Sequence, residues 1–321
     1  MVVRGPEAPF LPDVSARSAS TTDLARMQTP DSPFSTTARC AAWLSAWWLC
    51  ATLAGAQVLP AYAVFDGQGK KLSHERMLRT VAAGDIVLFG EAHDNPIAHW
   101  LQLVVARDLA ARGPLVMGAE MIEADDQATL DHYLHGEIDQ AAFDTLARLW
   151  KNHVTDYAPL VDLAKEKGLP FVATNVPRRY ARAVSKGGFT ALDTVPVAQR
   201  AWMAPLPIAF DATLPGYVRM LTLMEDHGTP EMVQAQALKD ATMAHFIARH
   251  TAQGVRFLHF NGSFHSDFHE GIGWYLQRAL PALKRVTITT VSQERLERLD
   301  PAYHGQADIV ICVDAAMTRT H

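Results

Sequence analysis

Side chains that can transfer protons or bind metal ions follow directly after a short apolar run at residues 86–89. After Gly90, which ends this run, the polar residues are Glu91, His93, Asp94, Asn95 and His99. In open parallel sheets, ligands bind at the edge where strands end and helices begin. A turn that caps a helix beginning at Pro96 would explain Asp94 and Asn95, but not Glu91 close to His93. Glu91 and His93 are therefore the first candidates for a functional site.

Other predicted strands of the chain also end in polar side chains. These are Glu120 after 115–119, Asn175 and Arg178 after 171–174, and Asn261 and His265 after 255–260. Because parallel strands have their carboxyl ends at one edge of the sheet, residues far apart in the sequence can converge there. We therefore predict that Glu91, His93, Glu120 and His265 face a single polar cleft.

Two kinds of chemistry suit these four residues. Their carboxylates and imidazoles could bind a divalent metal such as zinc or manganese, which would activate water while one Glu acts as the general base. They could also form a catalytic proton-transfer set without a metal. The three cysteines show no metal-binding spacing. A serine hydrolase is not supported, because the chain has no Gly-x-Ser-x-Gly motif.

The elements that must position these residues alternate along the chain. We predict about six strands, at residues 86–89, 115–119, 171–174, 255–260, 286–291 and 307–313. Predicted helices lie between them, at residues 96–112, 127–134, 140–149, 157–167, 231–249 and 273–280. This order indicates an α/β fold, in which a mainly parallel sheet has helices on both faces. Residues 181–251 contain no strand-like run, and we expect a helical insertion that caps the sheet edge.

The N-terminal part of the chain differs in composition from the rest. Residues 1–38 are rich in Ser, Thr, Pro and Ala and are typical of a disordered leader, and Met27 is an alternative start. Residues 39–63 combine one Arg, an apolar run and the triplet Ala61-Tyr62-Ala63, which together indicate a cleaved signal peptide. An uncleaved membrane anchor is the alternative. We expect a mature domain at 64–321 without a stable membrane anchor.

The overall composition is that of an ordinary globular protein. Nearly half of the 321 residues are hydrophobic, and a fifth are charged. The net charge of −5 gives no sign of a nucleic-acid partner. Fourteen histidines leave room for a metal or haem site. The oligomeric state stays open, with a homodimer among the alternatives.

The ordered set of motifs resembles the ChaN-like family of haem-binding uptake proteins, whose superfamily includes the TIKI/TraB proteases and the erythromycin esterases. The resemblance covers about residues 85–280. It rests on Gly90-Glu91-x-His93-Asp94-Asn95, Glu120-Met121, Asn175-x-Pro177-Arg178, Gly262-x-x-His265 and Gly271-Ile272.

This resemblance implies an α/β fold with a helical cap, a periplasmic location, and haem or iron uptake. In metal-dependent relatives, the positions similar to Glu91, His93, Glu120 and His265 form the active or metal site. Many ChaN-like proteins are lipoproteins, but neither Cys40 nor Cys50 follows a Leu-small-small pattern.

A haem site needs an axial ligand and an apolar slot. The candidate ligands are Tyr157 and His153, one turn apart, His269 beside Phe268, and the cluster around His132 and His135. We favour Tyr157. Arg178 and its neighbour Arg179 could pair with haem propionates, with Asn175 at the same edge. A binding protein for haem or iron is thus the favoured function, and a metal-dependent hydrolase is the alternative. A Soret band would indicate the first, and a colourless protein with stoichiometric zinc or manganese the second.

Overall fold

The fold is described from a computed structural model, which covers residues 60–223 and 227–320. The predicted leader at 1–38 and the predicted signal peptide up to residue 59 lie outside these described residues. The described residues belong to one compact unit, residues 59–321. None of the helices in the described part is both long and apolar enough to cross a membrane.

The centre of this unit is an eight-stranded sheet with the order β2-β1-β8-β7-β3-β6-β4-β5. The six strands β3 to β8 are parallel to one another, whereas β1 runs antiparallel to both of its neighbours, β2 and β8. The strand bounds are β1 Tyr62–Asp66, β2 Lys71–Leu72, β3 Ile86–Glu91, β4 Leu115–Glu123, β5 Phe171–Asn175, β6 Arg256–Gly262, β7 Arg285–Gln293 and β8 Ile309–Asp314.

Helices connect the parallel strands. Their bounds are α2 His74–Ala82, α3 Pro96–Arg112, α4 Gln127–Leu134, α5 Gln140–Leu146, α6 Ala158–Lys167, α7 Arg178–Gly187, α8 Pro215–Leu223, α9 Pro230–His250 and α10 Ile272–Ala279. Shorter turns of 3-10 helix are η1 Ala124–Asp126, η3 Phe189–Leu192, η4 Val197–Trp202, η6 Ser263–His265, η7 Asp267–His269 and η8 Pro301–Tyr303, and η2 His153–Tyr157 is a π-helix.

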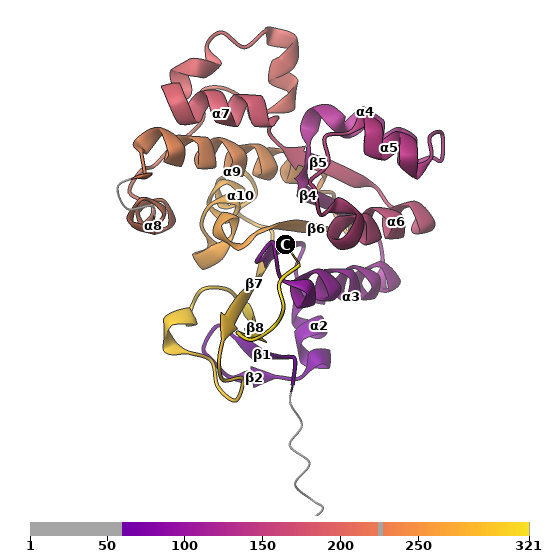
Figure 1. Cartoon of the computed structure of the whole chain (residues 1–321), viewed down its shortest axis with the longest axis vertical. Helices are drawn as coiled ribbons and strands as arrows, with labels where there is room; N and C mark the ends of the chain where they lie inside the picture. The colour runs from indigo at the N-terminus through magenta and orange to yellow at the C-terminus, as the bar shows by residue number, and fades with distance from the viewer. Residues whose placement is uncertain (1–59, 224–226, 321) are drawn as a thin grey trace, which may run out of the picture. The chain divides into compact units, whose positions relative to one another are not determined.

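Alternate residues of β3 pack against different helices, because successive side chains of a strand point to opposite faces. Val87 and Phe89 belong to the apolar cluster that includes residues of α3 and α6. Ile86 and Leu88 belong to a second cluster, which contains residues of α9 and α10. In Figure 1, α9 and α10 lie on one side of the strands, and α3 and α6 on the other. The sheet is therefore covered on both faces, as a parallel sheet requires.

Local sequence signals set the start of α3 and the end of α6. The Asn95 side chain accepts hydrogen bonds from the backbone N–H groups of Ile97 and Ala98, and Pro96 takes the first helical position of α3. Gly168 ends α6 in the left-handed conformation, with φ of 62°. The loop that carries His93 is thereby fixed between β3 and a well-capped helix.

The predicted fold class is confirmed, and the differences concern strand number and element ends. Eight strands replace the six expected, because β1 and β2 were not recognised. α5 ends at Leu146, three residues before the predicted end. The residues expected to begin a helix at Tyr157 instead include a π-helical turn at η2. The described part of 181–251 contains helices and no strand.

The first strand bears on the predicted processing site. Tyr62 and Ala63 are part of β1, where they pair with Val313 and Cys312 of β8. Cleavage after Ala63 would remove two of the five residues of β1. A chain cleaved after Ala63 would therefore lose the pairs that Tyr62 and Ala63 form with β8.

Candidate functional site

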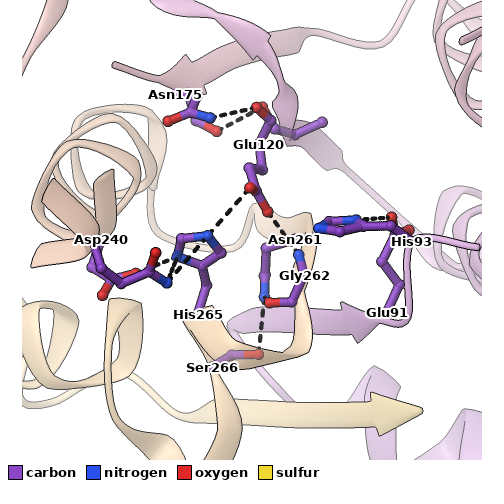
Figure 2. Close-up of polar contacts among 12 residues, drawn as sticks. Glu91, His93, Glu120, Asn175, Asp240, Asn261, Gly262, His265 and Ser266 are labelled. Carbon is purple, nitrogen blue, oxygen red and sulfur yellow. Dashed lines mark hydrogen bonds and ion pairs between the residues drawn. The ribbon is translucent and has the colours of Figure 1, made fainter. Parts of the chain in front are cut away.

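One cleft of about 490 Å³ lies at the carboxyl ends of β3, β4 and β6. The four residues expected to converge, Glu91, His93, Glu120 and His265, all line it. The helical insertion also contributes to its wall, with Met220 and Leu223 from α8 and with Gln236 and Lys239 from α9. Figure 2 shows Glu120 between His265 and Gly262, with the Glu91–His93 pair on the far side of Gly262.

Glu91, the last residue of β3, is a buried carboxylate that several donors hold in place. Its Oε1 accepts hydrogen bonds from Tyr157 Oη at 2.7 Å and from His93 Nδ1 at 2.8 Å. Its Oε2 accepts one from Gln102 Nε2 and lies 3.3 Å from His99 Nδ1. Burial alone would raise the pKa of Glu91, but the hydrogen bonds from His93 and His99 hold it below the usual value. Glu91 is therefore ionised at neutral pH.

His93 lines the cleft, with one ring nitrogen on Glu91 and the other beside Gly262. Its Nδ1 faces Glu91, and its ring packs edge-on against Trp150 at 4.9 Å between centroids. A Cβ atom on Gly262 would lie 2.7 Å from His93 Nε2, so only glycine leaves room for this ring. Burial lowers the pKa of His93, but the hydrogen bond to Glu91 and the charge of Glu120 raise it above the usual value. When neutral, His93 donates from Nδ1 and keeps a lone pair on Nε2.

A second network joins β4, α9 and the turn after β6. Glu120 Oε2 accepts a hydrogen bond from the backbone N–H of Gly262 at 2.7 Å, and Glu120 Oε1 lies 3.2 Å from His265 Nε2. The other ring nitrogen, His265 Nδ1, lies 2.5 Å from Asp240 Oδ1. Asp240 Oδ2 accepts a hydrogen bond from Tyr217 Oη at 2.9 Å. The imidazole of His265 is thus held between two buried carboxylates.

The charges in this second network stabilise one another. Burial disfavours the imidazolium of His265, but Glu120 and Asp240 outweigh it and raise the pKa of His265 to about 9. Conversely, His265 outweighs the effect of burial on Glu120 and holds the pKa of that carboxyl well below its usual value. Burial raises the pKa of Asp240. His265 is therefore a cation at neutral pH, held by a carboxylate at each ring nitrogen.

The remaining predicted site residues do not line the cleft. Tyr157 is buried behind Glu91, and burial together with the Glu91 charge raises the pKa of its hydroxyl, which opposes a tyrosinate ligand. His153 is buried against Phe143, and neither of its ring nitrogens has a hydrogen-bond partner. Burial lowers the pKa of His153.

The other three predicted residues lie at different places around the sheet edge. Asn175 is buried and donates a hydrogen bond from Nδ2 to the backbone carbonyl of Glu120 at 2.9 Å, which supports β4 but does not reach the cleft. Arg178 is exposed at the start of α7. His269 is half-exposed, with Nε2 3.9 Å from Asp308 Oδ1 on the side of β7 and β8. The pairing of Arg179 with Asp125 likewise leaves the predicted arginine pair away from the cleft.

The metal hypothesis gains no support from the described residues. Within residues 60–223 and 227–320, no group of three or more His, Cys, Asp or Glu side chains is arranged to hold a metal ion. The reason is visible in the two networks, because Glu91 is occupied by Tyr157 and Gln102, and Glu120 by Gly262 and His265.

Sequence reasoning missed residues that hold the site together. Asp240 and Tyr217 orient His265, and Gln102 orients Glu91. Asp240 and Gln102 lie on buried faces of α9 and α3, respectively, with no exposed surface. A polar residue at an apolar position of an amphipathic helix is the signal that could have identified both.

The sheet order and the cleft define an α/β protein with a cleft at the carboxyl edge of its strands. The model of the family "Haem-binding uptake, Tiki superfamily, ChaN" matches residues 77–276, which is more than half of the chain. The chain therefore belongs to this family, as the motifs predicted. Among curated protein sequences, no relative matches the chain significantly.

Among solved structures, that of ChaN has a similar fold at low sequence identity. The structure of ChaN of Campylobacter jejuni with cofacial haem is 18% identical, with a TM-score of 0.59, and the match covers 78% of this chain and 96% of ChaN. The erythromycin esterase EreC is 11% identical, with a TM-score of 0.42 and coverage of 81% and 98%. The type III effector HopBA1 is 13% identical, with a TM-score of 0.45 and coverage of 74% and 91%.

The buried imidazolium of His265 makes the free energy of unfolding depend on pH in a defined window. Because the folded-state pKa of about 9 exceeds the unfolded value of about 6.5, the stabilisation is complete below pH 6.5 and is lost as pH rises through 9. We expect this group to contribute roughly 3 kcal/mol to the wild-type loss of stability over that window. Urea unfolding at pH 6.5 and 9.5 measures it, and His265→Gln should show a smaller change. Equal pH dependence in both proteins would contradict this assignment.

Proposed function

We propose that this protein binds haem in the cleft at the carboxyl edge of the sheet and serves haem or iron uptake in the periplasm. Membership in a haem-binding family supports the ligand. The observation that carries the proposal is the orientation of His93. His93 lines the cleft, its Nδ1 is held by Glu91 at 2.8 Å, and its Nε2 lies beside Gly262, another lining residue. A histidine that ligates a metal commonly donates its other ring N–H to a carboxylate in this way.

The walls of the cleft suit a flat apolar ligand. Leu223 and Phe264 line it and are 62% and 51% exposed, so the cleft presents apolar surface that a ligand can cover. Met220 lies in the same lining one turn before Leu223 on α8. When bound, haem would supply an iron centre that takes an imidazole as axial ligand. His93 would hold the iron, and the side chains of α8 and η6 would exclude water from the porphyrin.

The first test of this proposal is removal of the axial ligand. His93→Ala should lower haem affinity at least tenfold and change the Soret band seen on titration, because the variant lacks the imidazole. Wild-type affinity should also rise with pH through the raised pKa of His93, since a protonated ring cannot ligate iron. His74→Ala, at an exposed histidine that begins α2 and does not line this cleft, is the matched control. Haem binding by His93→Ala that equals the wild type would exclude this ligand.

A second candidate function is hydrolysis without a metal, which the same Glu91–His93 pair favours. His93 Nε2 could accept a proton from water, so that the hydroxyl oxygen attacks a carbonyl carbon and the leaving group later takes the proton from His93. Glu91 would hold the imidazolium that forms, and Lys239 lies in the same cleft to offset charge on the carbonyl oxygen.

This second candidate predicts chelator-resistant activity. Wild-type protein treated with EDTA should hydrolyse p-nitrophenyl acetate, and His93→Ala should lower the rate about 10²-fold or more, the usual contribution of a general base. Circular dichroism checks that the variant is folded. Activity that EDTA removes, or that His93→Ala retains, would argue against this mechanism.

The proposed periplasmic location requires processing that leaves β1 whole. The triplet Ala54-Gly55-Ala56 has the small residues of a signal-peptidase site and lies ahead of β1, unlike Ala61-Tyr62-Ala63. We therefore propose cleavage after Ala56 in place of Ala63. N-terminal sequencing of the exported protein should give Gln57. A sequence that begins at Val64 would restore the original site, and an intact membrane-bound precursor would contradict both.

A further inference from the structure

The cleft contains one cationic side chain without a close partner. Lys239 lines the cleft from α9, one turn after Gln236. Lys239 forms no hydrogen bond or ion pair with any other residue in the described part of the chain. The acids around it are already engaged, Glu120 by His265 and Gly262, and Asp240 by His265 and Tyr217. Its ammonium group is thus available for a ligand.

The lining is divided between charge and apolar surface. α9 contributes Lys239 and Gln236, and α8 contributes Met220 and Leu223. The charge of Lys239 also reaches Glu120, where it helps to lower the pKa of that carboxyl. A ligand that complements this lining has an apolar body and a negatively charged end.

The arginines expected to fill this role lie elsewhere. Arg179 Nη1 is 2.6 Å from Asp125 Oδ2, and Arg178 is exposed at the start of α7. Neither residue lines the cleft. Among the cleft-lining residues, Lys239 is a lysine that forms no hydrogen bond or ion pair with another described residue.

We propose that Lys239 is the anion-binding residue of the cleft and selects ligands that carry a carboxylate on an apolar body, which for haem is a propionate. This inference rests on the proposed haem site. A lysine acts as a point charge with three donors, so it can hold a carboxylate without fixing its orientation. A hydrogen bond between two charged groups is stronger than one between neutral groups, and the difference appears as selectivity against an uncharged analogue.

The test compares haem with its dimethyl ester, in which both propionates are neutral. Equilibrium titrations by absorbance, at one pH and ionic strength, give both affinities for each protein. Wild type should bind haem about tenfold to a hundredfold more tightly than the ester. Lys239→Gln should lose this preference while its affinity for the ester stays the same. Lys239→Arg should keep it, and so should Lys186→Gln, an exposed lysine on α7.

The outcomes test the role of Lys239 and the haem site separately. Wild type that binds the ester as tightly as haem, or Lys239→Gln that keeps the preference, would overturn the role of Lys239 while the haem site stands. A variant that loses affinity for both ligands equally would show a structural role and would also overturn it. If wild type binds neither ligand, the haem proposal itself fails, and the Lys239 assignment fails with it.

Discussion

Buried carboxylates at one sheet edge must be neutralised, and imidazoles do this throughout the site. Glu91 at the end of β3 and Glu120 in the second half of β4 are almost fully buried, and Asp240 has no exposed surface. An isolated ionised carboxylate in such surroundings would be strongly destabilising. His93 and His99 face Glu91, and His265 lies between Glu120 and Asp240. Removing one imidazole takes a neutralising group from a buried acid and leaves it only its remaining hydrogen-bond donors, such as Tyr157 and Gln102 at Glu91.

The same neutralisation attaches the helical insertion to the sheet. Asp240 lies in the middle of α9, and its two oxygens connect His265 of the turn after β6 with Tyr217 of α8. α9 also contributes Met243 and Ile247 to the apolar cluster against β3 and β6. Apolar packing therefore sets the position of α9, and the buried charge sets its register. That register places Lys239, the residue before Asp240, at the cleft.

The position of strand ends predicted four residues of the site. The residues that were missed depend on side-chain direction, which the sequence does not show. Glu91, His93, Glu120 and His265 were found because each follows a strand, and the carboxyl ends of parallel strands share an edge. Sequence proximity could not show that the Tyr157 hydroxyl points to Glu91, since this depends on the π-helical turn before α6. Asp240 was missed because an acid within a helix usually faces solvent. β1 was missed because its five residues overlap the expected cleavage triplet.

His93 explains why one site supports two readings. Both ligation of iron and general-base catalysis require a neutral imidazole whose Nδ1–H is held by a carboxylate and whose Nε2 is accessible. Glu91 holds the Nδ1–H of His93 and also raises the pKa of the ring. Iron ligation and base catalysis would therefore both compete with protonation of Nε2. The rest of the cleft lining distinguishes haem binding from hydrolysis. Met220, Leu223 and Phe264 present apolar surface there, which a porphyrin can cover but a small polar substrate would leave exposed. The apolar wall of the cleft, and not the chemistry of His93, therefore favours the proposed haem ligand.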